Sequence, residues 1–129
     1  MDVLSSRVLL RPVDPARSRR FYADTLGLAV YREFGPPDEP GVVFFLGQGF
    51  LEVAGRSEAP AQAAGLSIWV QVRDVRHEER RLREAGVTVL RAPELEPWGL
   101  VEMWIADPDG HRLCLVEVPS DHPLRRDPR

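Results

Sequence analysis

The chain has 129 residues, 43% of them hydrophobic and 29% charged, which is typical of one soluble globular domain with a sizeable core. Its formal net charge of −3 provides no general attraction to phosphate backbones, so nucleic acid is not an expected partner. The sequence has no membrane-length apolar run, no signal-peptide pattern and only one cysteine, which together favour a cytoplasmic location without membrane contact.

The first half of the chain predicts one strand, one helix and then three further strands. The strand-like run RVLLRPV occupies residues 7–13. Asp14 and Pro15 are residue types that begin helices, and Gly27 is the type that ends them. The following predicted elements are a strand from about Leu28, a Pro-rich loop at 35–41, and two strands joined by a tight turn at 47–49.

The second half repeats this order of elements. The run SIWVQVR precedes Asp74, which is placed to cap a second helix that ends at Gly86. Asp74 follows Asp14 by 60 residues and Gly86 follows Gly27 by 59, which indicates an internal duplication. The remaining predicted elements are a strand from about Val87, a Pro-rich loop at 92–99, and two strands joined by a turn at 107–110.

Each half therefore reads β-α-β-β-β, and we expect a single α+β domain over residues 1–129. Within it, module one is expected at 1–55 and module two at 66–118. A linker rich in small residues is expected at 56–65, and a poorly ordered, Pro- and charge-rich tail at 119–129.

Strand alternation divides the side chains between a face packed under the helices and an opposite face. The opposite face collects tryptophans, glutamates, arginines and the cysteine, a mixture that is typical of a small-molecule cleft. We therefore predict a ligand-binding set on this face. It consists of Arg7, Leu9, Phe50, Glu52, Ser67, Trp69, Gln71, Glu102, Trp104, Arg112 and Cys114, with Trp98 at the rim or as a structural plug.

Three stretches carry a resemblance to a known family: FYADTLGLAVYREF, LREAGVTVLRAPELEPWG and DPDGHRLCLVE. With the paired modules, they resemble the vicinal oxygen chelate superfamily, which includes glyoxalase I, extradiol dioxygenases, fosfomycin-resistance proteins and bleomycin-binding resistance proteins. The resemblance covers Arg7 to Val118. It implies two modules that form a curved mixed sheet around a cleft, with the helices packed on the outside.

The metalloenzymes of this superfamily hold a divalent metal with four ligands, typically His or Gln, Glu, His and Glu. Carried over position by position, the resemblance places Arg7, Glu52, Ser67 and Cys114 at these four places. Only Glu52 keeps the residue type, since arginine is a permanent cation and a serine hydroxyl is a poor ligand. His77, His111 and His122 are expected at solvated positions and complete no site. We expect no bound metal and no other cofactor.

Several residues have two open interpretations. Cys114 is interpreted as a small filler, although a cationic neighbour such as Arg7 or Arg112 would make it a reactive thiolate. Arg7 and Glu52 either bind an anionic ligand group together or form an internal ion pair in place of the metal charge. Glu102 is expected to be a solvated strand carboxylate rather than a general base. Trp69 and Trp104 are expected to stack on a flat ligand.

We expect a metal-free, homodimeric protein that binds a small molecule and sequesters a drug or metabolite, with bleomycin-binding proteins as the nearest analogue. The alternative is a lyase, isomerase or dioxygenase-like enzyme that uses Glu52 or Glu102, with an atypical metal site or none. A third hypothesis is a scaffold or regulatory subunit whose cleft is vestigial.

Overall fold

The structure is a computed structural model that describes residues 1–59 and 65–124. It divides into two compact units, the first comprising residues 1–62 and 108–110 and the second residues 63–107 and 111–129. The central part of the expected linker, residues 60–64, and the end of the expected tail, residues 125–129, lie outside the described residues. No helix of the described parts is long and apolar enough to cross a membrane.

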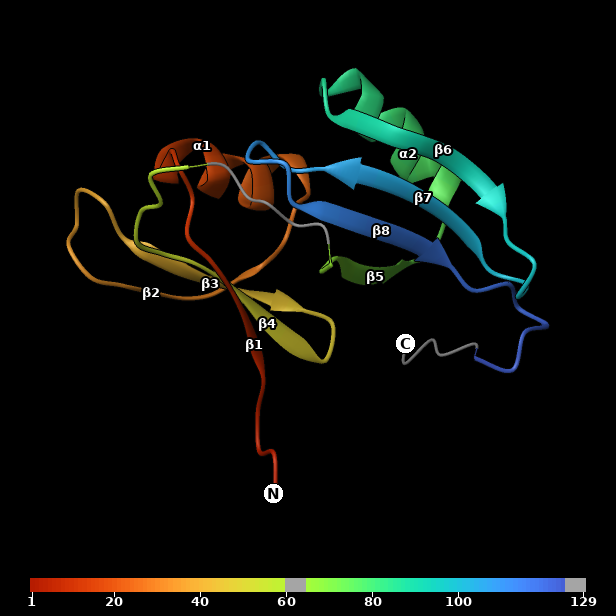
Figure 1. Cartoon of the computed structure of the whole chain (residues 1–129), viewed down its shortest axis with the longest axis horizontal. Coiled ribbons are helices and arrows are strands. Elements are labelled where there is room, and N and C mark those ends of the chain that lie inside the picture. The colour runs from red at the N-terminus through yellow and green to blue at the C-terminus, as the bar shows by residue number, and fades with distance from the viewer. Residues whose placement is uncertain (60–64, 125–129) are drawn as a thin grey trace. The chain divides into compact units, whose positions relative to one another are not determined.

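The first unit contains a four-stranded mixed sheet and one helix (Figure 1). In this sheet the strand order is β1-β4-β3-β2, with β1 parallel to β4 and the other neighbours antiparallel. Its elements are β1 (Arg7–Leu10), α1 (Pro15–Arg20), the π-helical turn η1 (Phe21–Thr25) that continues α1, β2 (Val30–Phe34), β3 (Gly41–Leu46) and β4 (Gly49–Val53).

The second unit repeats this topology, with the strand order β5-β8-β7-β6 and β5 parallel to β8. The matching orders confirm the two β-α-β-β-β modules of an α+β fold. The elements of this unit are β5 (Ile68–Val72), α2 (Val75–Glu84), β6 (Thr88–Leu95), β7 (Val101–Ala106) and β8 (Arg112–Glu117).

Both helices begin and end where the sequence predicts. The Asp14 carboxylate accepts a hydrogen bond from the Arg17 backbone N–H at 3.1 Å, and Asp74 accepts one from His77 N–H at 3.0 Å. This backbone hydrogen bond holds the pKa of Asp74 below its ordinary value. Gly27 and Gly86, with φ of +76° and +79°, follow the helix ends in the left-handed region that glycine favours.

The helix-packed face of each sheet forms a core, as strand alternation predicts. Helix α1 packs on β4, and α2 packs on β6, β7 and β8. The buried side chains of the sheet faces are Leu10, Val42, Phe44, Leu51 and Val53 in the first unit, and Met103, Ile105, Leu113 and Leu115 in the second. The helices add Phe21 and Tyr22 in the first unit and Val75 and Leu82 in the second.

Strand β6 extends further than the sequence indicates. The expectation of a loop over 92–99 is wrong for its first four residues, because β6 continues to Leu95. Pro93 is tolerated there since β6 borders only β7 and lies at the edge of its sheet. The pairing shifts between Val89 and Arg91 and again between Arg91 and Glu94, which is how the edge strand accommodates the proline-containing segment.

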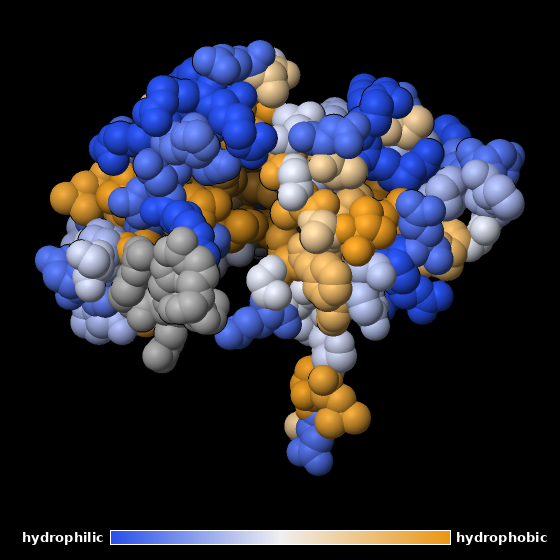
Figure 2. Space-filling model, turned by 180° about the vertical axis from the view of Figure 1, so that it is seen from behind, coloured by the Kyte–Doolittle hydropathy of each residue, from blue (hydrophilic) through white to orange (hydrophobic). Residues whose placement is uncertain are grey.

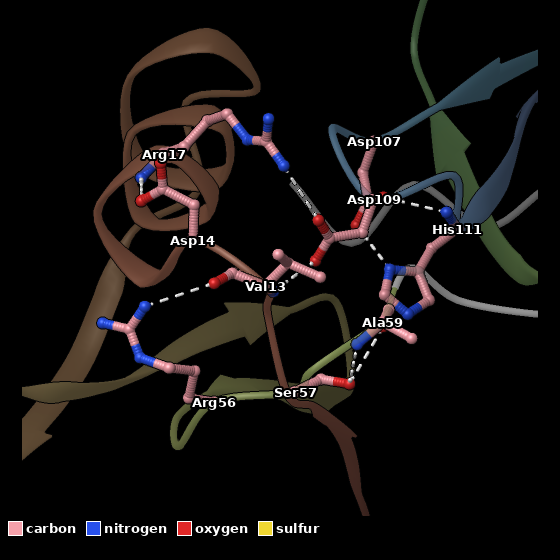
Figure 3. A network of polar contacts seen from close by, with 9 residues as sticks. All are labelled: Val13, Asp14, Arg17, Arg56, Ser57, Ala59, Asp107, Asp109 and His111. Carbon is pink, nitrogen blue, oxygen red and sulfur yellow. Dashed lines mark hydrogen bonds and ion pairs between the residues drawn. The ribbon is translucent and has the colours of Figure 1, made fainter.

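The DPDG turn supplies a structural carboxylate to the first unit (Figure 3). Asp109 is buried and accepts hydrogen bonds from the Val13 backbone N–H and from Arg17 Nη2, both at 3.0 Å. In the second unit, Asp107 accepts a hydrogen bond from His111 N–H and contacts the His111 ring Nδ1, both at 2.8 Å. The expectation that His111 is solvated is therefore wrong.

The segment after β8 is attached to the second unit. His122 N–H donates to Pro119 O at 3.0 Å, and the His122 ring Nε2 lies 3.1 Å from Trp98 O. Residues 119–124 of the expected tail are therefore held by hydrogen bonds, and His122 is partly exposed with both ring nitrogens in hydrogen-bond contact with the backbone. At the other end of the chain, residues 1–6 are exposed, and Figure 2 shows apolar atoms on this segment at the bottom of the view.

Candidate functional site

In the first unit, four predicted site residues lie together on the face of the sheet away from α1. Strand register pairs Arg7 with Phe50 and Leu9 with Glu52. Arg7 Nη1 donates to Glu52 Oε1 at 2.8 Å, so the carboxylate has a cationic partner from the neighbouring strand. The internal ion pair is therefore present. It is still partly exposed, so other N–H groups of the Arg7 guanidinium can also donate to an added anion.

Two aromatic residues that the sequence prediction missed extend this face. Tyr31 and Phe45 stack with Phe50, the three ring centroids lying 4.9 to 5.8 Å apart. Phe45 was recognisable, because alternation along β3 places it beside Phe50. Tyr31 was not, because the register of β2 shifts between Val30 and Arg32 and moves the intervening residue out of the alternating pattern.

In the second unit, the two tryptophans expected to bind a ligand flank the cysteine. Register pairs Trp69 of β5 with Cys114 of β8, and Cys114 with Trp104 of β7. The backbone positions of the two tryptophans are thus two strand spacings apart, roughly 10 Å, and both side chains are on the face away from α2. Trp69 is 52% exposed and Trp104 is half-buried. A small side chain between two large rings fits the interpretation of Cys114 as a filler.

Glu102 is not the solvated strand carboxylate that we expected. Glu102 is only 6% exposed, and its two carboxylate oxygens have different hydrogen-bond partners. Trp98 Nε1 donates to Oε2 at 2.7 Å, and Cys114 Sγ donates to Oε1 at 3.6 Å. The indole of Trp98 therefore covers Glu102 from the loop before β7. This agrees with the plug role for Trp98, although Trp98 itself remains 58% exposed.

The environment of Cys114 excludes the reactive thiolate. The residue is 2% exposed, and burial, followed by the charge and hydrogen bond of Glu102, raises the pKa of its thiol to about 12. Arg91 contributes only a smaller opposing effect. A thiol with this pKa stays protonated at neutral pH, so it is not a nucleophile in this state.

Part of this face is filled by the protein itself. Cys114 packs in a buried apolar cluster with Leu100, Val116 and Val118, and Trp104 packs against it. Of the other predicted residues, Gln71 lies opposite Val116 in the register, and Ser67 is exposed just before β5. Cys114 and Glu102 are therefore buried beneath the surface that a ligand would touch, contrary to their predicted place in its lining.

Beside this cluster, the second unit has a hollow of about 400 Å³ lined by Leu90, Arg91, Trp104 and Arg112. Arg91 is neutralised by ion pairs with Glu94 and Glu96, and its Nη2 also donates to Glu102 O at 3.2 Å. The hydrogen bond to Glu96 raises the pKa of Arg91 above its ordinary value. Trp104 and Arg112 were predicted from alternation, whereas Leu90 and Arg91 were missed because the register shift in β6 falls between Val89 and Arg91.

The residues present do not fit the divalent metal of the related metalloenzymes. The Glu52 carboxylate is bound to Arg7, and the buried Cys114 Sγ donates to the Glu102 carboxylate. Across residues 1–59 and 65–124 there is no group of three or more His, Cys, Asp or Glu side chains placed to hold a metal ion. A guanidinium at one ligand position would also repel a cation.

Two repeated β-α-β-β-β units, each with a mixed sheet and one helix, define a glyoxalase-like fold. The sequence model of the Glyoxalase/Bleomycin resistance protein/Dioxygenase superfamily matches residues 5–115, and the chain belongs to this superfamily. Among proteins with curated descriptions, none matches the chain in sequence.

Solved structures with this fold include proteins of several kinds. A superfamily member from Sphaerobacter thermophilus DSM 20745 is 27% identical with a TM-score of 0.69, over 91% of this chain and 97% of that one. TnmS3, an antibiotic binding protein from Streptomyces sp. CB03234, is 18% identical with a TM-score of 0.71, over 92% and 98%. A lactoylglutathione lyase from Agrobacterium tumefaciens is 20% identical with a TM-score of 0.67, over 91% and 94%. These similarities extend over nearly the whole of each chain.

Proposed function

We propose that this protein binds a small molecule without a metal, in the hollow beside Trp104, and sequesters a drug or metabolite. The observation that carries the proposal is the hollow itself, with one indole wall, one aliphatic side chain and two guanidinium groups. Its volume of about 400 Å³ lies within the range of small-molecule sites, and a few polar groups on an apolar wall are their usual lining.

We propose no metal chemistry, because other side chains stand at the positions where the related metalloenzymes have metal ligands. Arg7 already supplies positive charge to Glu52, and Cys114 is buried with its Sγ hydrogen-bonded to Glu102. Sequestration needs only complementary shape and hydrogen bonding, so it is compatible with both replacements. TnmS3, whose fold is similar, is an antibiotic binding protein, which makes a drug a reasonable ligand class to test.

Neither of the two carboxylates named for the enzyme alternative is free to act as a general base. Glu102 is buried between Trp98 and Cys114, and Glu52 is bound to Arg7. A general base must reach the proton that it removes, and neither oxygen pair lines the hollow. We therefore do not propose acid-base turnover as the function.

The test is a ligand screen read by tryptophan fluorescence, followed by titration of each hit against wild type, Trp104→Phe and Trp98→Phe. Binding in the hollow predicts a saturable change in emission that Trp104→Phe weakens or abolishes and that Trp98→Phe preserves. Mass spectrometry of desalted protein after exposure to zinc, manganese, iron(II) and nickel is the companion measurement. A stoichiometric metal, or hits that are indifferent to Trp104→Phe, would contradict the proposal.

Two further expectations accompany this function. We propose a homodimer, since related drug-binding proteins are expected to pair, and light scattering coupled to size exclusion measures its mass directly. A cytoplasmic location is also proposed, and fractionation of cells that express the chain from its own gene would test it.

A further inference from the structure

The donor and acceptor pattern of the hollow restricts the chemistry of its ligand. Its polar side chains are two guanidinium groups, which carry only hydrogen-bond donors, and the indole of Trp104 likewise has a donor and no acceptor. The fourth lining residue, Leu90, is apolar. A ligand with its own donors would find no side-chain acceptor here, so the matching ligand presents oxygen acceptors beside an apolar ring.

The two arginines of the hollow differ in how many ion-pair and hydrogen-bond partners their side chains already have. Arg91 is bound by Glu94 and Glu96 and by the backbone oxygen of Glu102. The side chain of Arg112, in contrast, has no acidic or hydrogen-bonding partner among residues 1–59 and 65–124, and the residue is exposed at the start of β8. The available charge at the hollow is therefore that of Arg112, whose planar fork matches a carboxylate in two parallel hydrogen bonds.

We infer that the ligand of the hollow is a flat aromatic or polycyclic molecule that carries a carboxylate or an equivalent oxyanion. The ring packs on Trp104 and Leu90, and the oxyanion pairs with Arg112. Amines and other cations are disfavoured, because Arg112 would repel them and none of the four lining side chains is a carboxylate. This inference rests on the proposed function, since it specifies the ligand class of the same hollow.

Three naphthalene probes that differ in one substituent test the inference by isothermal titration calorimetry. They are 2-naphthoate, 2-naphthalenemethanol and 2-naphthylmethylammonium, so the ring is constant while the substituent is anionic, neutral or cationic. We expect the naphthoate to bind most tightly, the alcohol more weakly, and the ammonium not measurably. Because the anion contact is partly exposed, the affinity for naphthoate should fall as ionic strength rises.

Arg112→Gln is the decisive variant, and Arg80→Gln on the exposed surface of α2 is its control, with the same change in net charge. Loss of a charged hydrogen bond should weaken naphthoate binding by about tenfold or more in Arg112→Gln. Alcohol binding should be unchanged in that variant. Arg80→Gln should bind all three probes as wild type does. Circular dichroism and thermal unfolding verify that both variants are folded.

The possible outcomes separate the ligand class from the proposed function. If the alcohol binds and Trp104→Phe weakens it, but naphthoate has no advantage or Arg112→Gln has no effect, the hollow is a binding site and the oxyanion inference is wrong. Equal or tighter binding of the ammonium probe also overturns the inference. If none of the three probes binds wild type, the inference is refuted, whereas the proposed function is refuted only if the wider ligand screen also gives no hit that Trp104→Phe weakens.

Discussion

Cys114 should be almost inert to alkylation in the folded protein. Only the thiolate reacts with iodoacetamide, and burial beside Glu102 raises the thiol pKa from an ordinary value of 9.0 to about 12. At pH 8, a thiol with a pKa of about 12 is ionised to about one part in ten thousand, against about one part in ten at the ordinary value. The folded protein should therefore react about a thousandfold more slowly than the unfolded chain, before steric exclusion slows it further.

The assay compares two alkylation rates of the same single thiol. Iodoacetamide labelling at pH 8 is followed by intact mass, once in buffer and once in urea sufficient to unfold the chain. Because Cys114 is the chain's only cysteine, each rate belongs to one site. Passage through the unfolded state adds only a small rate when the unfolded population is small. A native rate within about tenfold of the unfolded rate would refute the buried, protonated thiol.

Glu102→Gln separates the two causes of this pKa shift. Glutamine keeps an acceptor for Trp98 Nε1 but removes the negative charge that opposes thiolate formation. The native alkylation rate should rise, yet it should stay below the unfolded rate because burial is the larger cause. An unchanged rate would mean that the Glu102 charge does not act on Cys114.

Three further predictions concern the elements that support the site. Gly99→Ala should lower the melting temperature more than Gly27→Ala does. Both glycines have positive φ, but only at Gly99 would the new Cβ lie 3.0 Å from a ring atom of His122. Equal decreases in melting temperature would contradict this packing. Asp109→Ala should reduce the free energy of unfolding in urea by about 1–3 kcal/mol, since two donors lose their acceptor, and an effect below about 0.5 kcal/mol would argue against it. Because the folded-state pKa of Asp74 lies below 3.8, the Asp74 carboxylate stabilises the folded state above that pH, and this stabilisation is lost on further acidification. Asp74→Asn should therefore make stability less dependent on pH in this acidic range, as measured by acid titration of ellipticity.

The backbone plan of the protein was predictable because its signals are local. Capping aspartates, a proline at the first helical position and glycines after the last turn mark both helices, and each contact spans only a few residues. Alternation then separated the core side of each strand from the opposite side, including the row of Trp69, Cys114 and Trp104. These features need no knowledge of how distant segments pack.

Depth of burial was not predictable in the same way. Alternation correctly assigned Glu102 to the face away from α2, but it could not show that Trp98 and Cys114 would enclose the carboxylate. That enclosure depends on the path of a loop and on the neighbouring strand. Arg7 and Glu52, which lie 45 residues apart in sequence and meet because β1 pairs with β4, were expected together only through the family resemblance and not through a local pattern.

Three of the missed residues, Tyr31, Leu90 and Arg91, share a physical origin in the duplicated fold. Register shifts occur between Val30 and Arg32 in the first unit and between Val89 and Arg91 in the second, at positions 59 residues apart, the same offset that relates the two helix ends. At each shift one extra residue breaks the period of two, so the residues on its two sides face opposite ways.

The register shift in β2 and the matching shift in β6 bring different residue types to the two units. In the first unit the extra residue is Tyr31, which joins an aromatic group beside a carboxylate already paired with Arg7. In the second unit it is Leu90, which together with Arg91 forms one side of a hollow whose free cation is Arg112. The backbone device is shared, so the difference in binding chemistry lies in the side chains. Ligand selectivity should therefore change with substitutions at Leu90 and Arg112 while the sheet remains intact.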